Sequence, residues 1–415
     1  MFDQNYQFTC VNRFLQYVKY DTQSDEESTS FPSSEKQKNL SRLLVEELKQ
    51  LGISDAHMDD WGYVMATLPS NTNKKVDPIG FIAHVDTSPA VSGANVITMI
   101  HKKYKGGDIK LPKDKQVIKA KENPNLKNMK GYDIITSDGS TLLGADNKCG
   151  VAEIIDAVNY LINHPEVKHG DIKICFTPDE EVGRGTEKFD VKKYGAKYAY
   201  TVDGQSRGEV ETETFSADGV TVKFYGKNIH PGYAKGIMIN SMKIAAAFIE
   251  LLPKKTLSPE TTEKREGYVH PVTINGNEEL TTVRFIIRDF KTSQLKKYES
   301  LLKKLAQKAV KKFPGAKMEF TVNEQYRNMR EVLKNHPQVE NNAIEAMKRL
   351  NIKPIMHPIR GGTDGARLSF MGLPTPNIFA GEHSFHSKTE WVSVQDMEMA
   401  VCVIVEIAKI WEEKA

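Results

Sequence analysis

The stretch "DIKICFTPDEE", residues 171–181, is a short apolar run that ends in three consecutive acids. Adjacent carboxylates repel one another, and the end of a buried strand is a costly place for them. Three more strand-like runs occur in the first half of the chain: "GYVMATLP" (62–69), "PIGFIAHVD" (78–86) and "AKYAYTVDG" (196–204). Helical patterns at residues 33–52, where Ser33 or Ser34 is a candidate N-cap, and at 150–163 separate them. Strands alternating with helices predict an α/β domain whose mixed, largely parallel sheet has helices on both faces.

The pattern changes near residue 213. Strands with polar alternation at 215–226, 278–290 and 316–326 surround two helical segments at 240–253 and 293–313. This β-α-β-α-β order predicts a small inserted α+β domain of the ferredoxin-like type. We therefore expect residues 1–213 and 326–415 to form the larger domain and residues 214–325 to form the insertion.

Composition excludes several classes of protein. The 415 residues include 57 basic and 54 acidic side chains, so a net charge of +3 implies no general attraction to nucleic acid or an anionic membrane. Four distant cysteines without C-x-x-C spacing favour reduced thiols, and the N-terminus lacks the apolar core of a signal peptide. No apolar run is long enough to span a bilayer. These features predict a cytoplasmic enzyme or binding protein.

Residues of the types that bind metals follow three of the predicted strands and one turn. They are His84 and Asp86 in "FIAHVDT", Glu180 and Glu181 in "ICFTPDEE", Asp203 in "YAYTVDG", and Asp146 in the turn "LLGADNKCG". In open α/β sheets, sites form at the carboxyl ends of strands, and acids gathered there repel one another unless a cation lies among them. Imidazole and carboxylate ligands suit zinc or a similar divalent ion. The set exceeds what one tetrahedral zinc needs, so two metals sharing a bridging carboxylate is the favoured interpretation.

Each fragment alone also has a simpler explanation. An H-x-D pair occurs by chance, an aspartate at a strand end is usually a turn residue or helix cap, and adjacent glutamates are usually solvated. The occurrence of all these fragments at successive strand ends is what favours a metal site.

Other segments add candidate residues with open roles. In "GEHSFHSKTE" (381–390) either His383 or His386 can be a ligand. Arg360 in "IRGGTDGARLS" suits a carboxylate or oxyanion better than a phosphate, because the loop lacks the Lys-Ser/Thr of a P-loop. His230 in "KNIHPG" and Arg288 in "IIRDF" are also candidates, with ordinary surface polarity as the alternative.

The assembled motifs carry a family resemblance. "HVDT", "GADNK", "TPDEEVG", "TVDG", "NIHPG", "IRGGTDG" and "FHSKTE" occur in the order found in the dinuclear zinc peptidases of the aminoacylase/carboxypeptidase G2 type. The similarity covers essentially the whole chain and is greatest to the members that act as aminopeptidases on tripeptides. One departure is Asn147, where many relatives have a second aspartate.

The resemblance implies a role for each matching residue. Asp146 bridges two Zn²⁺ ions, with Co²⁺ or Mn²⁺ as possible substitutes; His84 and Asp203 complete one site, and Glu181 and His386 complete the other. Glu180 is the general base, Asp86 orients His84, and the peptide bond beside Asp146 is cis. His230, Arg288 and Arg360 contact the substrate carboxylate or the oxyanion. The inserted domain forms a lid and a homodimer contact, through which His230 reaches the neighbouring subunit's site.

These implications predict a zinc-dependent aminopeptidase that removes the N-terminal residue of tripeptides, with no nucleic-acid or membrane partner. The alternatives that keep the metal site are a dipeptidase, a carboxypeptidase or an N-acyl amino acid deacylase. A non-catalytic peptide-binding protein is the alternative from another class.

Overall fold

The computed structural model describes residues 2–3 and 5–415, and the chain separates into two compact units. Unit 1 comprises Met1–Thr212, Val332–His357 and Thr363–Ala415, and unit 2 comprises Glu213–Glu331 and Pro358–Gly362. Unit 2 thus extends past the predicted end of the insertion at residue 325 and includes a second short segment. That segment belongs to unit 2 because Arg360 donates hydrogen bonds to the carbonyls of Lys264 and Glu266.

Unit 1 is built on an eight-stranded mixed sheet. In order across the sheet, the strands are β1 (His57–Met58), β2 (Val64–Leu68), β8 (Ile172–Thr177), β3 (Ile79–His84), β9 (Tyr198–Gly204), β16 (Asn377–Phe379), β10 (Glu209–Glu211) and β15 (Ile355–Met356). The central strands β8, β3, β9 and β16 are parallel, while β1, β2 and β10 each run antiparallel to a neighbour. The predicted fold class is confirmed.

The register brings the ends of the central strands to one edge of the sheet. Residues 79–84 of β3 pair with 172–177 of β8, and residues 79–82 of β3 pair with 198–201 of β9. Side chains alternate between two cores along these strands: Phe81 belongs to the larger core and Ile82 to a smaller core on the other face. Burial on both faces explains why these strands are almost continuously apolar.

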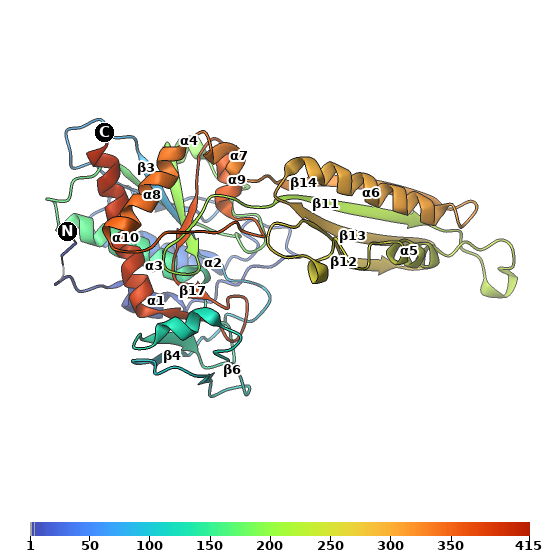
Figure 1. Ribbon diagram of the computed structural model, residues 1–415, viewed down its shortest axis with the longest axis horizontal. Coiled ribbons are helices and arrows are strands. Elements are labelled where there is room, and N and C mark those ends of the chain that lie inside the picture. The colour runs from blue at the N-terminus through green and yellow to red at the C-terminus, as the bar shows by residue number, and fades with distance from the viewer. Residues whose placement is uncertain (1, 4) are drawn as a thin grey trace. The chain divides into compact units, whose positions relative to one another are not determined.

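Helices cover both faces of this sheet (Figure 1). The larger core includes residues of α1 (Cys10–Tyr17), α2 (Gln37–Gln50), α3 (Ala145–Asn163), α8 (Pro337–Arg349) and α10 (Val394–Glu413). The smaller core includes residues of the short helices α4 (Val191–Tyr194) and α9 (Asp364–Phe370). The remaining helical turns are η1 (Pro124–Met129), α7 (Arg330–Leu333), η2 (Pro231–Tyr233) and η3 (Pro259–Thr261).

Two small antiparallel sheets complete unit 1. One has the strand order β17 (Glu382–His383), β18 (Trp391–Ser393), β7 (Ile134–Ser137) and β4 (Thr98–His101), and the other pairs β5 (Ile109–Lys110) with β6 (Val117–Ile118). All four cysteines are buried free thiols. No helix among the described residues is long and apolar enough to cross a membrane.

Unit 2 is a four-stranded antiparallel sheet with two helices. The strand order is β12 (Tyr268–Gly276), β13 (Leu280–Asp289), β11 (Ser216–Tyr225) and β14 (Lys317–Tyr326), and the helices are α5 (Ser241–Glu250) and α6 (Thr292–Val310). Both helices contribute to the core of this unit, and the chain order β-α-β-β-α-β is ferredoxin-like. The sequence pattern missed β12 because it is an edge strand that contains Pro271 and is largely exposed beyond it.

Candidate metal centre

The imidazole of His84, at the end of β3, lies among three carboxylates. Its Nδ1 is 3.1 Å from the carbonyl oxygen of Asp86 and 3.3 Å from that residue's Oδ1. Its Nε2 is 2.8 Å from Oδ1 of Asp146 and 3.5 Å from Oδ1 of Asp203. Burial lowers the pKa of His84, but Asp203, Asp146 and Asp86 together raise it well above its ordinary value. The carboxylates therefore favour a positive charge at this position.

Asp146 lies between two imidazoles. The backbone of α3 is non-helical at Asp146 and Asn147, and the peptide bond between them is cis, as expected. One carboxylate oxygen of Asp146 faces Nε2 of His84, and the other lies 3.2 Å from Nε2 of His386. Burial raises the pKa of Asp146, but the two imidazoles lower it below its ordinary value. At the interrupted start of α3, each oxygen of this one carboxylate thus faces a different imidazole.

Glu181 and His386 form the other side of the cluster. The Oε2 atom of Glu181 is 2.7 Å from Nε2 of His386, whereas its buried Oε1 atom has no hydrogen-bond partner. Burial and Asp146 raise the pKa of Glu181 to about 8. Burial lowers the pKa of His386, but hydrogen bonds to Asp146 and Glu181 raise it to about 11. This side also favours a positive charge.

The carboxylate of Asp86, just after β3, binds the backbone that follows β8. Its fully buried carboxylate faces His84 and also accepts hydrogen bonds from the backbone N–H groups of Glu180 (3.1 Å) and Glu181 (3.2 Å). Burial, together with the charge of Asp364, raises the pKa of the Glu180 carboxyl. One carboxylate therefore fixes the segment that carries both glutamates relative to the imidazole.

Asp179, the first of the three consecutive acids in "DIKICFTPDEE", anchors the loop that contains it. It accepts hydrogen bonds from the backbone N–H of Ser33 (2.6 Å) and from Nε2 of Gln37 (2.7 Å), and its own N–H donates to Oε1 of Gln37. The prediction that Ser33 or Ser34 caps α2 is wrong. The Ser33 hydroxyl donates to Asp179 and the Ser34 hydroxyl donates to the carbonyl of Gln23, so α2 begins at Gln37 without a side-chain cap.

The donor set fits divalent cations. Potential ligand atoms of His84, Asp146 and Glu181 all lie within 4.8 Å of one another, and so do those of Asp146, Asp203 and Glu382. Among the residues that the structure describes, the Oδ1 atom of Asp203, like Oε1 of Glu181, is buried without a hydrogen-bond partner. Mixed imidazole and carboxylate donors suit zinc and similar ions, and Asp146 belongs to both groups. Cations among these residues would satisfy the unpaired oxygens and offset the repulsion between the acids.

Comparison with known proteins identifies the family. Residues 137–410 match the model of the family described as Peptidase family M20/M25/M40. The chain belongs to this peptidase family. It is 51% identical to the Peptidase T of Geobacillus sp. strain WCH70, over 98% of this chain and 99% of the relative. It is also 50% identical to the Peptidase T of Clostridium acetobutylicum, over 97% of this chain and 99% of the relative.

Solved structures of the M20 family share the fold. An aminopeptidase PepT from Bacillus cereus superposes with a TM-score of 0.74 at 22% identity, covering 97% of this chain and 98% of that one. A tripeptidase from Staphylococcus aureus gives 0.75 at 20% identity with the same coverage. A Bacillus subtilis member described as a dinuclear metal-binding peptidase gives 0.66 at 14% identity, covering 98% of both chains. M20 membership makes the chain a peptidase of a metal-dependent family, as the sequence motifs predicted.

The three predicted substrate-binding residues belong to unit 2. His230 is exposed, and its Nδ1 accepts a hydrogen bond from the N–H of Gly232. Arg288 donates to the carbonyl of Ile287 at 3.0 Å. Arg360 donates to backbone carbonyls at 2.8 and 2.9 Å, and its guanidinium lies 5.1 Å from the ring centroid of Phe215. Both arginines are thus held by backbone carbonyls of their own unit.

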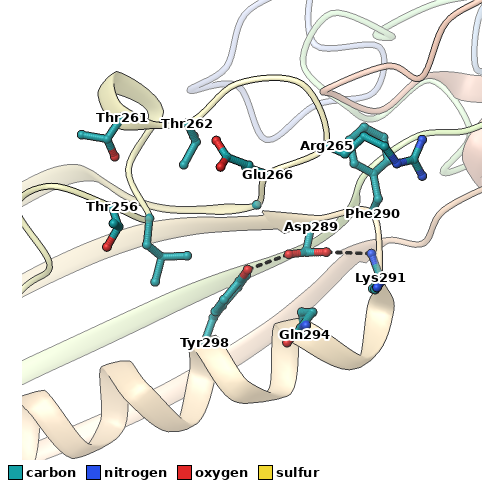
Figure 2. Close-up of a pocket in the computed structure, with 12 residues that line it drawn as sticks. Thr256, Thr261, Thr262, Arg265, Glu266, Asp289, Phe290, Lys291, Gln294 and Tyr298 are labelled. Carbon is teal, nitrogen blue, oxygen red and sulfur yellow. Dashed lines mark hydrogen bonds between the residues drawn. The ribbon is translucent and has the colours of Figure 1, made fainter.

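Unit 2 has a separate pocket of about 570 Å³ beside the start of α6 (Figure 2). Asp289 in this pocket accepts hydrogen bonds from the hydroxyl of Tyr298 (2.6 Å) and the N–H of Lys291 (2.8 Å). Arg265 pairs with Glu213. Because these charges already have partners, the pocket does not compete with the carboxylate cluster as a metal centre.

Glu390 is a site residue whose role was not predicted. Its buried carboxylate accepts hydrogen bonds from the backbone N–H groups of Leu143 (2.7 Å), Gly144 (2.9 Å) and Asp146 (3.0 Å). It therefore holds the turn that carries Asp146. The only signal in the sequence is an acid four residues after His386, which resembles an ordinary solvated loop residue.

We expect Glu390→Gln to lower the free energy of unfolding by about 1–3 kcal/mol, because an amide NH₂ group would face at least one backbone donor. The displaced turn should also weaken metal binding. Urea unfolding and metal titration measure the two effects. Glu398→Gln, at a half-buried position on α10, is the matched control and should change stability by less than about 0.5 kcal/mol. Unchanged stability and metal binding in Glu390→Gln would contradict the positioning role.

Proposed function

We propose that this chain is a metallo-aminopeptidase that removes the N-terminal residue from tripeptides and uses two zinc ions. The observation that carries the proposal is the pair of histidines, His84 and His386, facing opposite oxygens of the single buried carboxylate of Asp146. This arrangement suits a bridging ligand between two cations. The names of the Peptidase T relatives and of the solved tripeptidase support the substrate class.

The protein residues would divide into binding and proton-transfer roles. His84, Asp146 and Asp203 would hold one ion, and Asp146, Glu181 and His386 the other. Bound zinc would lower the pKa of water and would act as a Lewis acid that polarises the peptide carbonyl. Asp86 contacts both the His84 ring and the backbone N–H groups of Glu180 and Glu181. These contacts hold the ring and the two glutamates in fixed positions relative to each other.

Glu180 is assigned to proton transfer. It accepts a proton from the attacking water and passes that proton to the leaving amine, which is general acid–base catalysis. The Glu180 carboxyl lies in a buried environment that raises its pKa, and a raised pKa suits a carboxyl group that must accept and release a proton. Glu180 belongs to neither group of clustered ligand atoms.

We assign recognition of the peptide's terminal carboxylate to Arg288 and Arg360, because guanidinium groups bind carboxylates in a fixed, bidentate geometry. A fixed distance between this carboxylate and the reacting bond would select tripeptides. His230 is assigned to the developing oxyanion, and the functional form is proposed to be a homodimer through unit 2.

A panel of peptides with and without chelation tests the function. Tripeptides with a free N-terminus should lose their first residue, while matched dipeptides, tetrapeptides and N-acetylated tripeptides should react at least about tenfold more slowly. Removal of metal should abolish turnover, and added Zn²⁺ should restore it.

Other products of the same panel would support the alternatives. Preferred hydrolysis of dipeptides indicates a dipeptidase, release of the C-terminal residue a carboxypeptidase, and release of the acyl group a deacylase. Peptide binding without turnover by the zinc-loaded protein would contradict every hydrolytic assignment.

A further inference from the structure

Glu382 is a further carboxylate beside the candidate metal centre, and neither the motif pattern nor the proposed mechanism gives it a role. It is the first residue of β17, where it pairs with Val392 of β18, and it is 1% exposed. One carboxylate oxygen each from Glu382, Asp146 and Asp203 lie within 4.8 Å of one another. The Oδ1 atoms of Asp146 and Asp203 lie 2.8 and 3.5 Å from Nε2 of His84, so the three acids converge on the side of the cluster that contains His84.

The Glu382 carboxylate takes part in no ion pair among the residues that the structure describes. Among residues 2–3 and 5–415, no lysine, arginine or histidine lies within 4.0 Å of its oxygens as an ion pair, and its hydrogen bond comes from the Cys149 thiol at 3.5 Å. A thiol is a weak donor and offsets little of the cost of burying a carboxylate. The neighbouring Oδ1 atom of Asp203 also lacks a hydrogen bond. Two carboxylates with incomplete hydrogen bonding thus lie close together.

We propose that Glu382 is a fourth protein ligand of the cation held by His84, Asp146 and Asp203. This inference rests on the proposed dinuclear site and extends it. The two cation positions are then unequal. The first has one imidazole and three carboxylates, while the second has one imidazole, from His386, and two carboxylates.

The difference between the two ligand sets should make the two positions prefer different metal ions. Additional carboxylate oxygens favour a harder ion with a higher coordination number, such as Mn²⁺. Zinc usually takes four ligands and prefers a larger share of imidazole nitrogens among them. The position beside His84 is therefore the one at which Mn²⁺ competes best with Zn²⁺. Glu382 sets this preference through its charge.

The test uses metal-free full-length protein and three variants. Glu382→Gln removes the charge and keeps the shape, and Glu382→Asp keeps the charge but withdraws the oxygens. Glu153→Gln is the matched control, because Glu153 is a fully buried glutamate on α3 whose two oxygens have no hydrogen-bond partner among the described residues, yet it lies outside both ligand groups. Elemental analysis gives the number of ions bound, and chelator competition with Mn²⁺ or Zn²⁺ gives each dissociation constant.

The wild-type protein should bind two ions. Glu382→Gln should weaken one of the two sites by at least about tenfold, with a larger loss for Mn²⁺ than for Zn²⁺, and leave the other site unchanged. Glu382→Asp should weaken the same site, and Glu153→Gln should bind metal as the wild type does. The Tm of metal-free Glu382→Gln should equal or exceed that of the wild type because repulsion is removed, while the rise in Tm on adding Mn²⁺ should be smaller.

Two outcomes separate this inference from the function on which it rests. If the wild type binds two ions and Glu382→Gln binds both with unchanged affinity, Glu382 is a neutral buried acid and the inference is overturned while the peptidase assignment stands. If the wild type binds no divalent ion, the dinuclear site and the inference fail together. If Glu382→Gln does not fold, unchanged metal affinities in Glu382→Asp overturn the inference.

Discussion

Peptide turnover by a Glu180→Ala variant should fall by about 10²–10⁴-fold while the content of bound metal stays at the wild-type level. The methyl group of alanine cannot accept the proton of the attacking water. The backbone of residue 180 still donates to Asp86 at 3.1 Å, so the strand end should keep its position. The loss should therefore appear in kcat rather than in KM or in metal stoichiometry.

The matched comparison is the neighbouring residue. Glu181→Ala removes a carboxylate that lies 2.7 Å from His386, so it should lose metal as well as activity. Steady-state kinetics and elemental analysis on the two variants separate a proton-transfer group from a ligand. A Glu180→Ala protein that keeps most of its activity, or that loses metal, would show that the roles of the two glutamates are assigned wrongly.

Asp146→Ala should abolish turnover and lower the affinity for both ions, since both imidazoles face this one carboxylate. Asp203→Ala should weaken only the ion beside His84, because Oδ1 of Asp203 lies 3.5 Å from Nε2 of His84 and, in the described part of the chain, Asp203 forms no hydrogen bond or ion pair with Glu181 or His386. Elemental analysis after equilibration with limiting Zn²⁺ distinguishes these outcomes.

Asp179→Asn is the control for removing a buried negative charge near the same strand end. Asp179 bonds to Ser33 and Gln37 rather than to the cluster, so this variant should keep two ions. Full occupancy of both positions in Asp146→Ala would mean that Asp146 does not bridge.

The fold of unit 1 could be predicted because its central strands are buried on both faces. Burial gives nearly uninterrupted apolar runs, and each run stops where a charged side chain is placed at the sheet edge, as His84 and Asp203 are. β12 was missed because an exposed edge strand needs neither an apolar run nor strict alternation. The cap of α2 was misassigned because Ser33 binds Asp179, a contact across 146 positions that no local pattern records.

The predicted ligand residues of unit 1 lie together, but residues that act from neighbouring loops could not be found from sequence. Glu382 and Glu390 fall in the same ten-residue segment as His386, and acids in such segments are usually solvated. Only the pairing of β17 with β18 and of β18 with β7 places this segment against the start of α3. The roles of these acids depend on tertiary contacts rather than on spacing along the chain.

The hydrogen bonds by which Glu390 holds the turn of Asp146 also determine when the site can form during synthesis of the chain. His84, Asp146, Glu181 and Asp203 lie within residues 84–203, but His386 and Glu390, which fixes the Asp146 turn, follow more than 180 positions later in the chain. A growing polypeptide therefore carries four ligand residues before His386 and the Glu390 contacts that hold Asp146 are available. On this account, the proposed two-ion site can be complete only after residue 390 has been synthesised and its carboxylate has bound the Asp146 turn.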